Sequence, residues 1–267
     1  MDVALNEGKA YFVETANYKT YLREVGEGTD VMSLLLLTLL FGVVAIVCAR
    51  HGFFLPEGMV DLKKGEAFAN TDYALAHSLL DAHDQRWIML SYDIWCAYGV
   101  NLKKRFQEWF PNASTLLDNL RGAIPKMHIK NHIEACQLLF AFNYLEGSGD
   151  TCGEIVESGW SVGNQAAGST KEMNDGHRHD VLDDYHTYYN FMKTRKIASS
   201  NYFTYNSCLD QLRSKETKFC ALESSLPLDV IQRWSQLDDQ PQRKGKNVIS
   251  VHIAQYGKGP PTQEKAY

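Results

Sequence analysis

The sequence predicts an α/β fold in which short apolar strands alternate with helices. Residues 43–48 and 87–90 form two short apolar runs, and the first is rich in β-branched side chains, as is typical of buried strands. Between and after them, apolar residues recur at helical spacing. The 267 residues are 45% hydrophobic and 12% aromatic, which suffices for one large core or two small ones and excludes a fully disordered chain.

The first hundred residues predict strands and helices in alternation. Residues 1–25 indicate a short strand and then an amphipathic helix, and residues 43–48 indicate a strand. The turn-rich stretch 50–72 indicates a long loop or a hairpin. Residues 72–84 predict a helix, and residues 87–94 predict a strand that we expect near the centre of a mixed sheet.

The remainder of the chain is predicted to be mostly helical. We expect helices over 97–120 with a break at Pro111-Asn112, a short strand and a helix over 122–144, a Gly-rich linker over 145–153 and a helix over 154–167. Asp180 is the expected N-cap of a further helix, followed by helices over 202–222 and 226–237. From Pro241 onward we expect a loose tail.

Residues 31–48 form an almost wholly apolar stretch with two interpretations. Its length is that of a marginal transmembrane span, which would make the chain a single-pass membrane protein. The alternative is a buried helix over 31–41 that runs through Gly42 into the strand over 43–48. The rest of the chain has the composition of a compact soluble protein.

Charge and cysteine usage restrict the partners and the compartment. The net charge of −5 shows no overall basic bias, so contact with DNA would depend on the local basic clusters 103–105, 193–196 and 243–246, each of which can equally be a solvated helix face. None of the six cysteines forms a CxxC pair, which favours reduced thiols in the nucleus or cytoplasm.

Two groups of acidic residues suggest a carboxylate metal site. Asp93 follows the apolar run 87–90, and Glu154 and Glu157 are three residues apart, so that both can face one side of a helix. Carboxylate oxygens suit Mg²⁺ or Mn²⁺, and two-metal phosphoryl chemistry uses several of them. A third acidic ligand is needed and is not identified. The alternative is a surface helix with solvated glutamates.

A second candidate metal site contains His128, His132 and Cys136. Their i, i+4, i+8 spacing would place all three on one helical face, and imidazole and thiolate suit zinc. Cys152 is a candidate fourth ligand. The alternative is a core cysteine beside histidines that cap a helix. A dense His/Asp group over 177–186 is explained by helix capping and the helix dipole, with metal binding as its alternative.

Four segments follow one another in a characteristic order: GVVAIVCARHGFFLPEGMVDLKKGEAFANTDYAL, SYDIWCAY, PKMHIKNHIEACQLLFAFNYLEGSGDTCGEIVESGW and GNQAAGSTKEMNDGHRHDVLDDYHTYYNFMK. In this order they resemble the Kyakuja–Dileera–Zisupton (KDZ) transposases abundant in mushroom-forming fungi. The resemblance spans roughly residues 8–195 and, more weakly, the tail.

The resemblance implies a ribonuclease H-like core that uses Asp, Asp and Glu with Mg²⁺ or Mn²⁺ to cut and rejoin DNA. Asp93 would be the second carboxylate and Glu154 the third. The implied division is residues 1–96 for the first part of the core, 97–150 for a helical insertion, 151–200 for the catalytic-helix part of the core and 201–267 for a helical extension and tail. DNA is the implied partner, with self-association as a further expectation and no small-molecule substrate.

The sequence departs from the family pattern at three places. The first catalytic Asp is not found, because Asp2 lacks a strand context, so the core is expected to be incomplete at its N-terminus. Cys152 and Ser158 stand where the family has Asp and Arg, and the Leu-rich stretch 31–41 replaces a more polar segment. We therefore expect a transposase or transposase-derived protein that is inactive in strand transfer. A non-catalytic DNA- or protein-binding descendant is the alternative.

Overall fold

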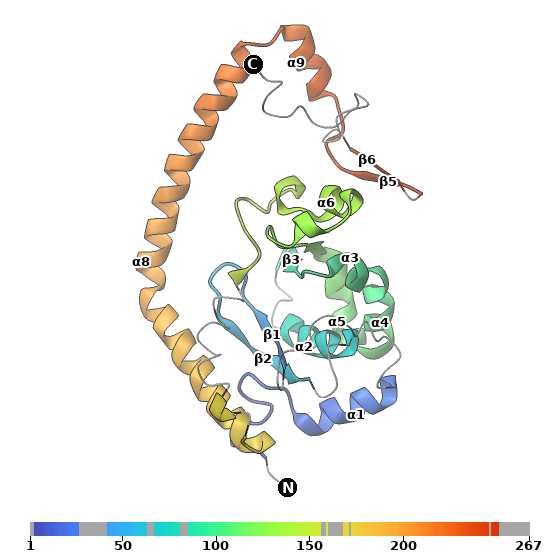
Figure 1. The fold of residues 1–267 in the computed structure, drawn as a ribbon, viewed down its shortest axis with the longest axis vertical. Coiled ribbons are helices and arrows are strands. Elements are labelled where there is room, and N and C mark those ends of the chain that lie inside the picture. Colours follow the sequence, from blue (N-terminus) through green and yellow to red (C-terminus); the bar gives the residue numbers. More distant parts are fainter. Residues whose placement is uncertain are drawn as a thin grey trace.

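The computed structural model describes residues 3–26, 42–62, 67–80, 85–155, 159, 168–170, 172–245 and 247–250. These residues form a mixed but largely helical structure with three two-stranded sheets (Figure 1). The strands are β1 (Val43–Val47), β2 (Phe54–Asp61), β3 (Ile88–Ser91), β4 (Leu120–Ala123), β5 (Gln242–Lys244) and β6 (Asn247–Ile249). The α-helices are α1 (Thr15–Val25), α2 (Phe68–Leu80), α3 (Trp95–Tyr98), α4 (Leu102–Trp109), α5 (Pro111–Ser114), α6 (Glu134–Phe140), α8 (Asp175–Ser224) and α9 (Leu228–Ser235). The 3₁₀ helices are η1 (Gly99–Asn101), η2 (Thr115–Asn119), η3 (Ile129–Asn131) and η4 (Phe142–Tyr144).

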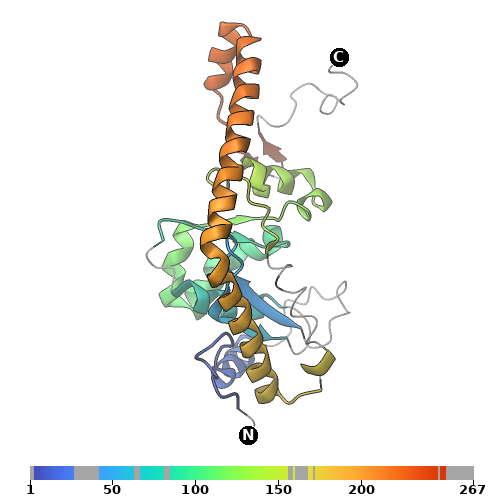
Figure 2. The same cartoon turned by 90° about the vertical axis from the view of Figure 1, so that its left-hand side faces the viewer.

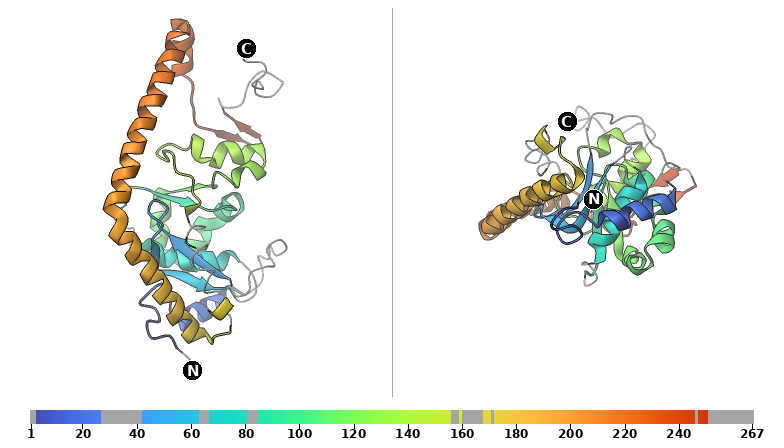
Figure 3. Two further views of the ribbon diagram at one scale, coloured as in Figure 1. Left: turned by 60° about the vertical axis from the view of Figure 1, so that its left-hand side comes forward. Right: turned by 90° about the horizontal axis from the view of Figure 1, so that it is seen from below.

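The antiparallel hairpin β1–β2 is the middle layer of the body. Alternate residues of β1 face opposite sides, as a strand requires. Val43, Ala45 and Val47 pack against the cluster around Phe12, Phe54 and Leu182, which belongs to the α8 side. Val44 and Ile46 pack against the cluster that α1 and α2 build on the other side (Figures 1 and 3). The predicted strand over 43–48 is confirmed. Within the stretch 50–72, residues 54–61 form a hairpin with β1, whereas the residues from Phe68 onward belong to α2.

The parallel pair β3–β4 is a separate sheet. Ile88 lies opposite Leu120 and Ser91 opposite Ala123, and both strands pack against α2, α3 and α4 through Leu75, Tyr98 and Phe106. Within the described ranges β3 has β4 as its single strand neighbour, so the single mixed sheet centred on the Asp93 strand is not observed. An apolar run predicts burial, but it does not determine which strand becomes its neighbour.

Polar residues in the first turns of α8 attach the N-terminal segment to the body. Asp180 accepts a hydrogen bond from the Leu5 amide at 2.7 Å, and Asp183 accepts one from the Tyr11 amide at 3.2 Å. His179 stacks on Phe12 with ring centroids 3.9 Å apart. The predicted strand and helix over 1–25 correspond to a bridge from Phe12 to Met59 of β2 and to α1.

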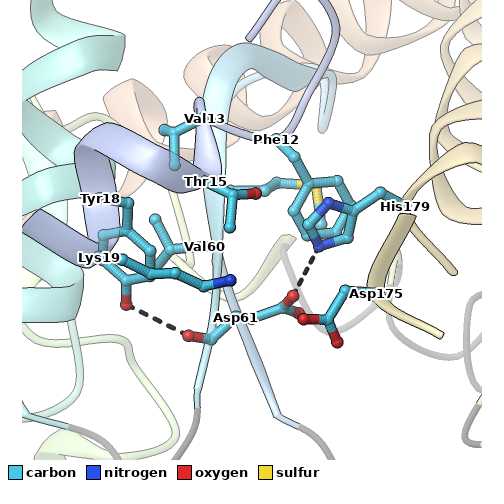
Figure 4. A pocket seen from close by; sticks show the side chains of 10 residues that line it. Phe12, Val13, Thr15, Tyr18, Lys19, Val60, Asp61, Asp175 and His179 are labelled. Atoms are coloured by element: carbon cyan, nitrogen blue, oxygen red, sulfur yellow. Dashed lines mark hydrogen bonds and ion pairs between the residues drawn. The ribbon is translucent and has the colours of Figure 1, made fainter. Parts of the chain in front are cut away.

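Asp61, at the end of β2, is the charged centre of this attachment. It is hydrogen-bonded to His179 Nε2 at 2.6 Å and forms an ion pair with Arg178. Burial alone would raise the pKa of Asp61, but the His179 hydrogen bond and the Arg178 charge outweigh it and lower the pKa. Figure 4 shows the adjoining pocket, whose volume of about 20 Å³ has room for a water molecule but not for an organic ligand.

Helix α8 is a single helix of 50 residues. The separate helices predicted around 180–195 and over 202–222 are therefore one element, consistent with the absence of Gly and Pro from residues 177–224. Asp180 as N-cap is wrong, because the Asn174 side chain accepts the hydrogen bond from the His177 amide at 3.1 Å and Asp180 lies inside the helix. The distal half of α8 projects beyond the body (Figure 2).

The other predicted helices agree with the structure in most places. Helix α2 confirms the prediction for 72–84 as far as residue 80, and helices from α3 to η2 occupy 95–119, with Pro111 at the first position of α5. Helix α9 confirms the short helix over 226–237. The loose tail predicted from Pro241 is wrong at its start, where β5 and β6 form a hairpin around Gly245, whose φ is +62°.

Part of the apolar stretch over 31–48 can be assigned. Residues 31–41 lie outside the described residues, and Val43–Val47 is β1. Among the helices that the structure describes, none has the length and apolar character needed to span a bilayer.

A buried ion pair joins α2 to α4. Asp72, 1% exposed, accepts two hydrogen bonds from the Arg105 guanidinium, at 2.6 Å from Nε and 3.1 Å from Nη2. The same guanidinium donates to the Tyr98 carbonyl at 3.1 Å and lies 5.2 Å from the Phe68 ring centroid. Arg105 is therefore engaged in the core and is not free to contact a phosphate.

We expect Arg105→Ala to lower the free energy of unfolding by about 3–5 kcal/mol, because it removes the cation that neutralises a buried carboxylate. The matched control is Lys103→Ala, on the same helix as Arg105, which breaks an exposed ion pair with Asp118. This change should lower the free energy of unfolding by less than about 1 kcal/mol. Urea unfolding of both variants measures the difference. Equal losses in the two variants would contradict this assignment.

Buried His186 should make stability depend on pH. Burial lowers the pKa of its imidazole from 6.5 to about 4, so between these values the unfolded chain binds more protons and stability falls as the pH falls. From pH 7.5 to pH 5 this loss is about 2 kcal/mol, and His186→Phe should remove it. Asp183, whose pKa burial raises to about 6, acts in the opposite direction in both proteins and cancels in the comparison. Urea unfolding at the two pH values tests this, and an unchanged pH dependence in the variant would refute it.

Candidate functional site

The carboxyl end of β3 carries the acidic residue singled out in the sequence. Asp93 lies two residues beyond the end of the strand, and its Oδ1 accepts a hydrogen bond from the Ile94 amide at 2.8 Å. This contact turns the chain directly into α3. The Asp93 side chain is half-buried, so it stands at the rim of the body.

Two glycines allow neighbouring segments to approach this strand end. A Cβ atom on Gly122 of β4 would lie 1.7 Å from the Trp95 indole, so the ring packs directly on the β4 backbone. Gly153 has a φ of +83°, and a Cβ atom there would lie 2.5 Å from both the Phe142 ring and Ser91 Oγ. At both positions any larger residue would displace an aromatic side chain.

A hydrogen bond of 3.0 Å from Ser91 Oγ to the Gly153 carbonyl holds the Gly153 segment against the end of β3. Asp93 follows Ser91 by two residues and Glu154 follows Gly153 by one. The hydrogen bond between Ser91 and Gly153 therefore brings together the two chain segments that carry the acidic residues. Glu154 is further held by the Met127 amide, which donates to its carboxylate, and the Lys126 amide donates to the Cys152 carbonyl at 2.9 Å. Glu157, the third acidic residue of the prediction, lies outside the described residues, as does most of the helix predicted over 154–167.

A cysteine–histidine cluster lies one helical turn beyond Asp93. The ligand atoms of Cys96, His132 and Cys136 all lie within 4.8 Å of one another, so the three residues could hold a metal ion. Cys96 Sγ is 3.5 Å from His132 Nδ1. Burial and the neighbouring Cys96 raise the pKa of the Cys136 thiol to about 11. Metal binding would therefore have to displace the proton from the Cys136 thiol.

The cluster is assembled differently from the sequence prediction. His128, His132 and Cys136 do not share a helical face, because η3 ends at Asn131, His132 is extended with ψ of 158°, and α6 begins at Glu134. His132 and Cys136 still meet, but Cys96 from α3 is the third member in place of His128, and Cys152 is not part of the group. Cys96 was missed as a ligand although it stands three residues after Asp93, a spacing that could have drawn attention to it.

Most of the other charged groups singled out in the sequence have structural partners. The His/Asp group over 177–186 is used in the contacts of α8 with the N-terminal segment and β2. In the basic cluster 103–105, Lys103 pairs with Asp118 at 2.5 Å and Arg105 with Asp72. In the cluster 193–196, Arg195 and Lys196 are exposed on α8, while Lys193 lies 4.8 Å from the Tyr189 ring centroid.

Comparison with known proteins assigns the chain to a class. A family model of transposases matches residues 40–190, from just before β1 into the first third of α8, and so includes both Asp93 and the cysteine–histidine cluster. The family is that of the Kyakuja-Dileera-Zisupton (KDZ) transposases, and the chain belongs to it. No curated protein and no solved structure matches the chain.

Proposed function

We propose that this transposase-derived chain retains the remnant of a metal-dependent DNA-cleaving site at the carboxyl end of β3. In this proposal Asp93 and Glu154 provide oxygen ligands for Mg²⁺ or Mn²⁺, and Glu157, three residues after Glu154 in the sequence, is a further acidic candidate. The observation that carries the proposal is the 3.0 Å hydrogen bond from Ser91 to Gly153, from which both acidic segments depart. We expect the two carboxylates to lie within roughly 4–8 Å, a span that bridging metal ions allow.

The fold that we propose for this site is a ribonuclease H-like core. Two observations support it: the hairpin β1–β2 and the parallel pair β3–β4 share helix α2, and β1 and β3 are only half-buried although their sequences, VVAIV and IMLS, are those of interior strands. Such exposure is expected if the complete core has a further strand between them. Within this core, residues 97–150 would be the helical insertion, 151–200 would return to the sheet and 201–267 would be the extension.

Two assigned carboxylates are too few for efficient catalysis. The family uses three, and Glu154 already accepts a hydrogen bond from the Met127 amide. When bound, the metal ions would activate the attacking oxygen and stabilise the leaving oxygen. Loss of one such contact in the transition state typically costs several kcal/mol, which corresponds to orders of magnitude in rate. We therefore propose that the chain binds DNA without completing strand transfer.

The basic residues of α8 favour DNA binding as the retained activity. Arg195 and Lys196 are exposed on α8, two and three residues after Lys193, and exposed cations of this kind contact backbone phosphates without reading sequence. This cluster is better placed for such contacts than the cluster 103–105, because Lys103 and Arg105 are held in ion pairs.

We expect supercoiled plasmid in Mg²⁺ or Mn²⁺ to be nicked by the chain no faster than by its Asp93→Asn variant. The same protein should bind DNA with an affinity that falls linearly with salt on logarithmic axes. Asp118→Asn is the control, because Asp118 is an exposed carboxylate paired with Lys103. Nicking that Asp93→Asn abolishes and Asp118→Asn preserves would show an active nuclease, and absence of binding at low salt would exclude the DNA-binding role.

We further propose that Cys96, His132 and Cys136 bind zinc, because thiolate and imidazole are its preferred ligands. Three protein ligands leave a fourth position for water or for a ligand outside the cluster. The ion would join α3 to the segment from η3 to α6. That segment follows directly after Met127, which contacts Glu154, so zinc at this place would stabilise the arrangement of the acidic site.

The purified chain should contain one zinc ion, and Cys96→Ser and Cys136→Ser should each lower its zinc content by at least half. Cys152→Ser should leave zinc unchanged, because Cys152 is exposed and outside the cluster. Elemental analysis measures the content, and thiolate-to-cobalt absorption after Co²⁺ substitution reports the ligands. Full zinc occupancy in Cys136→Ser would refute the assignment.

A further inference from the structure

The distal part of α8 presents an apolar stripe that no other part of the described chain covers. After Lys193, which lies against Tyr189 and beside Gly52 of the body, the helix continues for about 30 residues, roughly 45 Å. Most of its side chains there are exposed, although Lys215 lies close enough to Asp150 of the body to add to the effect of Lys126 in lowering the pKa of that carboxyl. Figures 1 and 2 show the distal end of this helix projecting beyond the body. Large apolar side chains remain exposed on it, including Tyr202 at 73%, Tyr205 and Phe219 at 63% each and Leu212 at 51%.

These side chains follow a heptad pattern. Positions 198, 202, 205, 209, 212, 216 and 219 alternate in steps of four and three residues, and we call them the distal seam: Ala198, Tyr202, Tyr205, Leu209, Leu212, Glu216 and Phe219. Six of the seven are apolar, whereas the residues between them are polar or charged except for Phe203 and Cys208. A 4–3 repeat keeps one face of a helix against another helix over its whole length, which a globular surface does not require.

We infer that the distal seam is a self-association surface, on which α8 of a second copy of this chain packs as a two-helix coiled coil. A second copy is the occupant that matches the seam in period, length and composition, because it carries the same stripe. The seam also lies beyond residue 190, where the family match ends. It therefore is a feature of this chain that the transposase family by itself does not imply.

Charge around the seam is compatible with a like partner. Glu216 is the one charged seam residue, and Arg213 and Lys215 occupy the positions that flank a coiled-coil seam. These basic side chains of a second copy would lie beside the Glu216 carboxylate. A single polar residue in a seam lowers stability but restricts the register of the two helices.

The area of the seam predicts a dimer of moderate affinity. An aromatic side chain has about 150–250 Å² of surface, so the three exposed seam aromatics of two chains offer on the order of 800 Å² in total. The leucines and flanking side chains bring the interface toward the ~1,200 Å² at which stable interfaces begin. We therefore expect association in the micromolar range, around −8 kcal/mol.

Sedimentation of the full chain over roughly 1–200 µM tests the inference, since a micromolar dimer must form across this range. The wild type should shift from monomer to dimer, and the double variant Leu209→Asp/Leu212→Asp should stay monomeric at every concentration. Its far-UV circular dichroism should show a folded protein, because neither residue contacts the core. The control is Ser207→Asp/Ser214→Asp, which adds the same charges on the opposite face of α8 and should still dimerise.

Glu216→Leu provides a test in the opposite direction. Replacing the one charged seam residue by leucine should tighten the dimer by about tenfold or more, by analogy with polar seam residues that lower stability. Three results would overturn the inference. The wild type could be monomeric at every concentration, as expected if the chain's own tail or nothing covers the seam. The double leucine variant could dimerise like the wild type, or the serine control could lose dimerisation to the same extent as the leucine variant.

Discussion

The arrangement of the candidate site depends on how closely two backbones approach the ends of β3 and β4. Trp95 lies on Gly122, and Gly153 lies within hydrogen-bonding distance of Ser91. Neither approach tolerates a Cβ atom. Since the first contact orients the helix after Asp93 and the second ends just before Glu154, the positions of both acidic residues follow from glycines that have no chemistry of their own.

The body around this site is held together by a few buried charges as well as by apolar packing. Asp72 and Arg105 connect α2 to α4, and Asp61 connects β2 to α8 through Arg178 and His179. Each carboxylate is neutralised by a partner from a distant part of the chain. Such pairs add little stability over apolar packing, but their loss is costly, so they restrict which helices can pack on which strands.

From the sequence, the helices and strands themselves could be predicted better than the elements with which they pair or pack. Strand β1, helix α2 and helix α9 follow from apolar periodicity, which is a local property. The pairing of β3 with β4 and the meeting of Cys96 with His132 depend on contacts between residues more than 30 positions apart. Composition of a short segment carries no information about such contacts. The capping error at Asp180 has a similar cause, since Asn174 competes for the same role and only the backbone geometry decides between them.

The length of α8 has a geometric consequence for any assembly of this chain. At 1.5 Å per residue, its 50 residues form a rod of about 75 Å, and the first third of it is anchored to the hairpin β1–β2. The middle of the distal seam, near Leu209 and Leu212, lies about 25 Å along the rod from the last contact with the body. Two bodies joined through these rods would be held at a spacing determined by helix geometry. DNA segments bound to the two bodies would then lie at a fixed distance from each other.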